Sequence, residues 1–251
     1  MRRKQDTIRL LHDPALPGVD NMARDETLMT RVGTGESVPT LRLYAWDPPT
    51  ISLGYFQRYA DYLNLAPPAR DLPVVRRLTG GGAILHDIEL TYSLTLPLAH
   101  HLLSNGTVKL YELVHDAVTA ALTSLGQESH RGGPTDDSSP TRGPFFCFAR
   151  RHSLDVLIGQ DKFAGSAQRR TRNALLQHGS IIVGSRFTQQ PSATLQTGFE
   201  GGVELLSEQL VEQFATMADV VVQPGEWTTT ELGAAESLIA KYAGNEWTRR
   251  M

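Results

Sequence analysis

The sequence RRLTGGGAILHD, which runs from Arg76 to Asp87, places three consecutive glycines between two short apolar runs. Residues 73–75 lead into it as Pro-Val-Val, and residues 83–85 form the second run as Ala-Ile-Leu. Apolar runs bounded by breakers are typical of strands, so the stretch predicts two strands joined as a hairpin by a glycine loop. Because glycine has no Cβ and can adopt positive φ, such a loop can bring backbone N–H groups against a ligand.

Polar side chains flank this loop. Arg76, Arg77 and His86 would supply hydrogen-bond donors around a bound ligand. On the glycines alone, a plain hairpin turn with solvated arginines is the commoner alternative. Two other phosphate-binding motifs are excluded by spacing, since no Lys-Ser or Lys-Thr follows the glycines as in a P-loop and no Gly-x-Gly-x-x-Gly opens a helix.

The composition is that of an ordinary globular protein. The chain has 251 residues, of which 40% are hydrophobic and 20% charged, and its formal net charge is -3. We expect one domain over residues 1–251 and no C-terminal accessory domain, because α/β folds often exceed the ~150 residues of a typical domain. This charge balance gives no bulk attraction for nucleic acid or for an anionic membrane.

Targeting signals are missing from the sequence. No apolar core of a signal peptide follows the N-terminus, and no run approaches the ~18 apolar residues that a membrane-spanning helix needs. Cys147 is the single cysteine, which excludes an intrachain disulfide and fits a reducing compartment. We expect a cytoplasmic protein that acts as a monomer.

Hydrophobic periodicity predicts an α/β (α+β) fold with a mostly antiparallel, strand-rich middle and helices toward both ends. The clearest helix covers residues 107–125, where apolar residues recur at i, i+3, i+4 and i+7. The segment 127–144 has no hydrophobic period and is expected to be a structureless, functional loop. Strands are expected at 7–12, 40–46, 50–56, 73–75, 83–96, 153–158, 162–168 and 174–183, and further helices at 21–32, 204–217 and 231–242.

Two predictions concern polar side chains on these helices. Asp25 and Glu26 could be taken for an acid/base pair, but adjacent residues do not face one another on a helix, so a solvated face is expected. His115 lies off the apolar stripe of its helix and is expected at the surface.

The glycine stretch resembles the signature of the lipoate–protein ligase and octanoyltransferase family. In that family an Arg-Arg-x-x-Gly-Gly segment followed by histidine lines the pocket for the acyl chain and its activated head. Residues 89–93, Glu-Leu-Thr-Tyr-Ser, are more similar to the cysteine-dependent octanoyltransferases than to the ATP-dependent ligases, which usually carry Gly-Asn there. Gly82 departs from the pattern, because those transferases often have arginine at this position.

Cys147 is the candidate nucleophile. A lone cysteine among phenylalanines is more often a small buried hydrophobe, although this one ends a long polar loop. Resemblance decides the matter, because Cys147-Phe148 followed by Lys162-x-x-Gly165 is similar to the octanoyltransferase pattern, in which the cysteine carries the acyl group. Residues 149–152 replace the usual acidic or proline-containing residues.

Lys162 alone would be interpreted as a solvated lysine beside a turn. The resemblance implies that its ammonium reaches the pocket, where it would stabilise the thiolate and polarise the thioester carbonyl. His86 and His178 are candidate proton shuttles, but a structural hydrogen bond is commoner, and both are ranked as binding or supporting residues. The substrate-binding residues implied are Arg76, Arg77, Thr79, Gly80, Gly81, Gly82, His86, Gly165, Ser166, Ala167, Gln168, His178 and Gly179.

The resemblance implies a biotin/lipoate–protein ligase-like fold and an acyltransferase of lipoate biosynthesis and protein lipoylation. An octanoyl (or lipoyl) group would pass from acyl-carrier protein to Cys147 as a thioester intermediate. It would then pass to a lysine of a lipoyl domain, such as the glycine cleavage H protein or the E2 of a 2-oxoacid dehydrogenase. No cofactor is expected, and no residue spacing predicts a catalytic metal.

Two alternatives remain at this point. An ATP-dependent lipoate ligase would use the same glycine loop for an acyl-adenylate, with ATP and Mg as cofactors and Cys147 incidental. A non-catalytic acyl- or carrier-binding protein would keep the pocket without the reaction, although the presence of both Cys147 and Lys162 argues against it.

Overall fold

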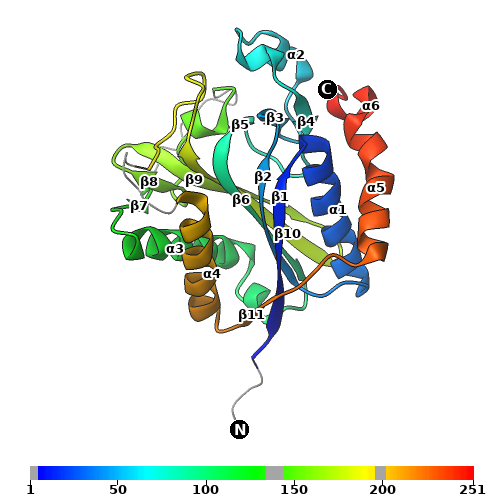
Figure 1. Ribbon diagram of the computed structural model, residues 1–251, viewed down its shortest axis with the longest axis vertical. Coiled ribbons are helices and arrows are strands. Elements are labelled where there is room, and N and C mark those ends of the chain that lie inside the picture. Colours follow the sequence, from blue (N-terminus) through cyan, green and yellow to red (C-terminus); the bar gives the residue numbers. More distant parts are fainter. Residues whose placement is uncertain (1–4, 134–143, 196–201) are drawn as a thin grey trace.

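A computed structural model describes residues 5–133, 144–195 and 202–251. At its centre lies an eight-stranded sheet of order β11-β1-β2-β6-β10-β9-β8-β7, with helices on both sides (Figure 1). Strand β1 runs parallel to β2 and β11, while the other neighbours in this sheet are antiparallel. Its strands are β1 (Thr7–Leu16), β2 (Thr40–Trp46), β6 (Ile88–Pro97), β7 (His130–Arg131), β8 (Val156–Ile158), β9 (Asp161–Arg170), β10 (Ala174–Gly184) and β11 (Val221–Pro224).

A second, three-stranded sheet holds the glycine loop. Its order is β4-β3-β5, with β3 (Thr50–Leu53) parallel to β4 (Val74–Arg76) and antiparallel to β5 (Ile84–His86). The hairpin expected across the glycines is therefore wrong, because β3 lies between the two strands. The glycine loop must therefore cross over β3. Arg77 supports this crossing, because its backbone N–H donates to Leu53 O of β3 at 3.0 Å and its side chain fills the space under the loop.

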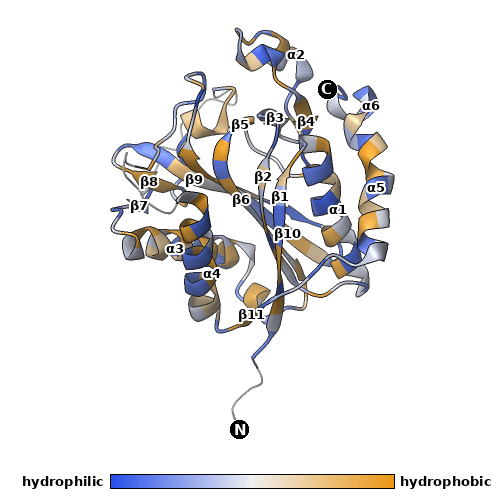
Figure 2. Cartoon of the chain, viewed as in Figure 1, coloured by the Kyte–Doolittle hydropathy of each residue, from blue (hydrophilic) through white to orange (hydrophobic). Residues whose placement is uncertain are grey.

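Helices cover the two faces of the large sheet in two pairs. Alternate residues of β6 separate the faces, because Leu90, Leu94 and Leu96 pack with α3 and α4 while Ser93 points to α1. The mix of hydrophilic and hydrophobic residues on each helix in Figure 2 fits this one-sided packing. The helices are α1 (Gly18–Thr34), α2 (Tyr59–Leu63), η1 (Ala69–Asp71), η2 (His101–Leu103), α3 (Thr107–Ser124), η3 (Cys147–Ala149), α4 (Gly202–Ala218), α5 (Thr229–Ala243) and α6 (Asn245–Thr248).

The predicted solvated carboxylates of α1 are wrong. Asp25 is only 2% exposed, because the buried guanidinium of Arg42 on β2 lies 2.9 Å from its carboxylate and compensates its charge. Glu26 is partly buried against α5, where Lys241 and Tyr242 donate to it at 2.6 and 2.8 Å.

The predicted surface position of His115 is also wrong. This side chain is 0% exposed, and both ring nitrogens have partners. Its Nδ1–H donates to Leu154 O, and its Nε2 accepts from the hydroxyl of Ser166 at 2.6 Å. Burial lowers the pKa of His115 to about 3, so the ring is neutral.

The segment 127–144 contains one short strand, β7, which the sequence did not predict; residues 134–143 lie outside the described residues. β11 was missed as well, because its four residues carry little pattern of their own. Among the described residues, no helix combines the length and the apolar character that crossing a bilayer would require.

Because His115 stays neutral in the folded chain, stability should fall in acid. The imidazole of His115 binds a proton near pH 6.5 in the unfolded chain but only near pH 3 in the folded chain. The contribution of the neutral ring to folding stability is therefore complete above pH 6.5 and is lost as the pH falls. We expect the free energy of unfolding to drop by a few kcal/mol between pH 7.5 and 4.5. Thermal melts of His115→Gln should show a weaker drop, while the exposed His130→Gln control should match the wild type. Equal pH slopes in all three proteins would contradict this assignment.

Candidate active site

A cavity lies between the small sheet and the large sheet, near the start of α1. Many of its lining residues are those that the sequence singled out. These are Arg77, Gly80, Gly81, His86, Cys147, Gly165, Ser166, Ala167, His178 and Gly179. The rest of the wall is largely apolar and was not predicted; it includes Met22, Tyr44, Trp46, Ile84 and Phe148.

Cys147 and Lys162 meet at the edge of this cavity. The Nζ of Lys162 lies 3.6 Å from the Sγ of Cys147 and 2.9 Å from Oδ2 of Asp155. Lys162 and Asp155 are 5% and 1% exposed, so the ammonium is buried with a carboxylate counter-ion. The ion pair lowers the cost of burying either charge and aims the remaining N–H groups of Lys162 at the thiol.

Gly165 makes this placement of Lys162 possible. A Cβ at position 165 would lie 2.3 Å from Cε of Lys162, which means that the lysine stem crosses directly over the glycine. The Lys162-x-x-Gly165 spacing therefore has a steric reason, since the side chain of Lys162 passes over the strand that carries it.

The cysteine loop is attached directly to the glycine loop. The backbone N–H of Cys147 donates to Ala83 O at 2.7 Å, and that of Ala83 donates to Phe145 O at 2.9 Å. A Cβ at Gly82 would lie 3.0 Å from the backbone N and Cα of Cys147. Gly82 thus permits the contact between the two loops instead of lining the cavity, and a side chain there would push the loops apart.

Arg77 holds the glycine loop in shape. Its Nη2 donates to Gly80 O at 2.8 Å and to Gly82 O at 2.7 Å, so one nitrogen joins both ends of the turn. Gly81 lies between them with φ +93°, a conformation that side-chain-bearing residues rarely adopt. The guanidinium is buried, which lowers the pKa of Arg77 to about 10, and the neighbouring Cys147 thiolate opposes this shift.

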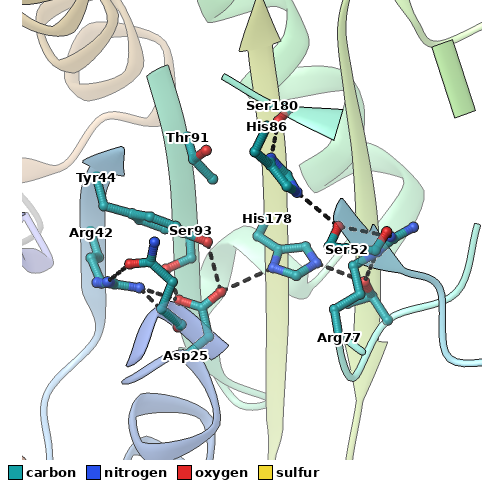
Figure 3. Close-up of polar contacts among 12 residues, drawn as sticks. Asp25, Arg42, Tyr44, Ser52, Arg77, His86, Thr91, Ser93, His178 and Ser180 are labelled. Carbon is teal, nitrogen blue, oxygen red and sulfur yellow. Dashed lines mark hydrogen bonds and ion pairs between the residues drawn. The ribbon is translucent and has the colours of Figure 1, made fainter. Parts of the chain in front are cut away.

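His178 connects Asp25 to this arginine (Figure 3). Its Nδ1–H donates to Asp25 Oδ2 at 3.0 Å, and in the neutral ring its Nε2 accepts from the hydroxyl of Thr79 at 2.6 Å. The Oγ of Thr79 accepts from Nε of Arg77 at 3.1 Å. Asp25 also accepts from Arg42, Tyr44 and Ser93, which fixes its carboxylate.

His86 makes a parallel connection. Its Nδ1–H donates to Glu89 Oε1 at 2.8 Å, and its Nε2 accepts from Ser52 Oγ at 2.7 Å. The Ser52 hydroxyl accepts from Nη1 of Arg77 at 3.2 Å. The ring stacks on Trp46 with centroids 3.7 Å apart, and burial lowers the pKa of His86, so the ring stays neutral.

Neither histidine offers a free ring nitrogen to the cavity, since every ring nitrogen of His86 and His178 has a partner. This geometry fits a supporting position for both. Two other predicted residues lie behind the cavity wall. Arg76 donates to the backbone carbonyls of Gly54, Tyr55, Gln57 and Thr248, and Gln168 donates to Gln177 and to Thr107 O.

Asp6, His100 and His101 form the one group of possible metal ligands in the part of the chain that the structure describes. None of them lines the cavity. The expectation of no catalytic metal stays a prediction.

The chain matches the family model "Lipoyl protein ligase A/B catalytic domain" over residues 17–222. In an alignment of 273 positions it is 34% identical to octanoyltransferase LipM of Kyrpidia tusciae, across 97% of this chain and 99% of the relative. In an alignment of 276 positions the LipM of Moorella thermoacetica is 34% identical, across 98% of each chain.

The chain belongs to the octanoyltransferase LipM family of lipoyl protein ligase A/B catalytic domains. Solved structures agree on the fold. A putative lipoate protein ligase from T. acidophilum has a TM-score of 0.80 at 22% identity, over 98% of this chain and 100% of that one. Lipoate-protein ligase A bound with ATP has a TM-score of 0.75 at 22% identity, over 98% and 99%. The expected biotin/lipoate–protein ligase-like fold is confirmed.

Several residues of this LipM family member escaped the sequence analysis. Asp155 stood within the expected strand 153–158, but nothing in the sequence marked it as buried. Asp25 and Glu89 were visible as carboxylates, yet only burial shows that each is held by a histidine. A carboxylate flanked by strand-forming residues, as Glu89 is in Glu-Leu-Thr-Tyr-Ser, was the one available signal.

Gly81→Val should abolish acyl transfer while the fold remains, because a β-branched residue is strained at φ +93° and its Cβ would lie 3.1 Å from Arg77 Nη2. Gly80→Ala is the matched control, since a Cβ there meets nothing within 4 Å. Circular dichroism and transfer rates would be measured on both. Wild-type transfer by Gly81→Val would mean that the glycine loop is only a turn.

Proposed function

We propose that this chain is an octanoyltransferase of protein lipoylation that carries the acyl group as a thioester on Cys147. The name of its LipM relatives supports octanoyl transfer. The observation that supports the cysteine route is the 3.6 Å contact between Sγ of Cys147 and Nζ of Lys162 at the edge of the cavity.

The first half-reaction exchanges one thioester for another. The Cys147 thiolate attacks the carbonyl carbon of the donor thioester, and the negative charge moves to the carbonyl oxygen. Collapse of this intermediate forms the Cys147 thioester and expels the donor thiolate, which takes up a proton. Lys162 stabilises the thiolate before attack and donates a hydrogen bond as charge develops.

The second half-reaction forms an amide. The neutral amine of an acceptor lysine attacks the Cys147 thioester, loses a proton, and expels the Cys147 thiolate, which restores the enzyme. Because an amide is much more stable than a thioester, this step draws the transfer to completion. Neither half-reaction needs ATP.

The acyl tail would lie along the apolar wall of the cavity. Met22, Trp46, Ile84 and Phe148 line it, and burial of a methylene against such a wall contributes about 0.8 kcal/mol. The seven alkyl carbons beyond the carbonyl therefore contribute several kcal/mol to donor binding, while the reacting carbonyl stays at the edge beside Cys147.

The partners we propose are acyl-carrier protein as donor and a lipoyl domain, such as H protein or E2, as acceptor. A bipartite lipoate protein ligase from Thermoplasma acidophilum, of the same fold at 20% identity, was solved in a study that also covers its E2 lipoyl domain. Under this proposal the enzyme acts in the cytoplasm and needs neither a cofactor nor a metal.

The ligase alternative makes a different use of the same cavity. Ligases at 22% identity share the fold alone and so do not assign ATP use to this chain. The buried Asp155–Lys162 pair directed at Cys147 favours the transferase, because an adenylate-forming enzyme has no need of a thiol held by a lysine.

Cys147 should become acylated by octanoyl-acyl carrier protein without ATP. Intact-mass measurement should show one added octanoyl group, which neutral hydroxylamine removes because it cleaves thioesters and leaves amides. Cys147→Ala should give no adduct, and Cys147→Ser at best a slow ester. If Cys147→Ala still modifies a lipoyl domain when ATP is supplied, the ligase alternative replaces this proposal.

Lys162→Met should slow acylation about a hundredfold, since it removes the charge that stabilises the thiolate and the oxyanion. It should also lower the melting temperature, because the Asp155 carboxylate is left buried without a counter-ion. The double variant Lys162→Met/Asp155→Asn should regain stability but no activity. Melting curves and acylation rates separate the two effects, and recovery of the rate in the double variant would exclude this role of Lys162.

A further inference from the structure

Two arginines from distant parts of the chain flank one aromatic ring beside the cavity. The guanidinium carbon of Arg169 lies 5.0 Å from the ring centroid of Tyr55, and that of Arg250 lies 4.1 Å from it. The backbone N–H of Tyr55 donates to Thr79 O at 2.8 Å, which attaches the main chain of Tyr55 to the residue before the glycine loop. Arg169 follows Ala167 on the same face of β9, and Ala167 lines the cavity. Both arginines therefore flank the mouth of the cavity.

More positive charge continues from this point. Arg170 and Arg172 are exposed at the turn after β9, and Arg249 lies over Tyr59 at 5.0 Å. Phe56 is 71% exposed and packs edge-on against Tyr55 at 4.9 Å. Figure 1 shows the C-terminal segment beside α2, and Tyr59 N donates to Met251 O at 2.7 Å. We call these residues the rim patch: Tyr55, Phe56, Arg169, Arg170, Arg172, Arg249 and Arg250.

The arginines of the rim patch differ from most surface arginines of this protein. Among residues 5–133, 144–195 and 202–251, none of the five has a carboxylate within ion-pair distance. Elsewhere, Arg31, Arg58 and Arg131 each pair with an acidic side chain. A hydrogen bond from Arg250, with the nearby charge of Arg169, lowers the pKa of Tyr55. In a chain of net charge -3, this is a local concentration of positive charge next to the mouth.

The composition of the patch indicates a protein partner more than a single phosphate. One or two guanidinium groups suffice for a phosphate, whereas five arginines here spread over two segments of the chain. Arginine and exposed aromatic side chains are the residues enriched at protein interfaces. The complementary surface is acidic.

We propose that the rim patch docks the acidic surface of the carrier protein that delivers the acyl thioester to Cys147. This inference rests on the proposed function. The acceptor is the poorer occupant, because it must bring a lysine ammonium to the same mouth and the arginines repel that charge. Charges at the rim of an interface mainly control association and its salt dependence, so the patch would act on donor binding and leave the chemical steps alone.

The test compares two donors that deliver the same acyl group. Arg169→Glu/Arg250→Glu would be incubated with octanoyl-acyl carrier protein or with neutral S-octanoyl-pantetheine, and acylation of Cys147 would be followed by intact mass. We expect the half-saturating concentration of the carrier donor to rise about tenfold or more, with its maximal rate within about twofold. The pantetheine donor should be unaffected. The milder Arg169→Gln/Arg250→Gln guards against misfolding and should show the same pattern to a smaller degree.

Salt and a control variant sharpen the result. Wild-type saturation by the carrier should weaken as salt rises, while the double charge reversal should be nearly insensitive. Arg31→Glu/Arg131→Glu, at the end of α1 and on β7 and with the same total change in charge, should behave as wild type toward both donors.

Each other outcome overturns the proposal. Equal losses with both donors would make the patch part of the cavity. Loss confined to transfer onto a lipoyl domain would make it an acceptor site, and an equal loss with S-octanoyl-4′-phosphopantetheine would assign recognition to the arm's phosphate. No change in any assay would mean that the patch docks nothing. If S-octanoyl-pantetheine and the carrier donor both fail to acylate wild-type Cys147, the proposed function fails instead.

Discussion

The buried guanidinium of Arg77 is the constraint on which the site depends. It lies under the glycine loop, joins the carbonyls of Gly80 and Gly82, and has no carboxylate partner among the described residues. Its N–H groups bond instead to carbonyls and to hydroxyls that are themselves held by histidines. Burial lowers the pKa of Arg77 to about 10, and Cys147 and Tyr44 oppose this shift.

The two faces of the large sheet serve different purposes. Toward α3 and α4 the strands present leucine, isoleucine and valine, which supply the apolar burial that stabilises the fold. Toward α1 they present Arg42, Glu89, Ser93 and His178, which pair with Asp25 of α1 and with His86 of β5. A polar interior of this kind is stable only when its groups are paired, and the paired groups here hold the cavity wall in a single arrangement.

Much of the fold could be predicted from periodicity. Helix α3 and the β8–β9 hairpin follow from strong local patterns, and the predicted bounds are close to the observed ones. The glycines, Cys147 and Lys162 were found because resemblance supplied what spacing could not. The failures share one cause: His115, Asp25 and Asp155 look like surface residues until tertiary contacts bury them. The hydrophobic periodicity of a segment does not show that a carboxylate is neutralised by an arginine or lysine distant in sequence. Likewise, local sequence could not place β3 between β4 and β5.

The bridge between Ala83 and Phe146 gives the loop of Cys147 and the wall of the cavity a common mechanical support. Cys147 belongs to a loop that the glycine loop holds by main-chain bonds on either side of Ala83. A movement of the glycine loop that enlarged the pocket for a longer or bulkier acyl chain would also move the sulfur of Cys147. The sulfur would then lose its contact with Lys162, which lies on β9. Changes of substrate are open instead at the far wall, where Met22 and Trp46 line the cavity from α1 and β2 and belong neither to the glycine loop nor to the loop that carries the thiol.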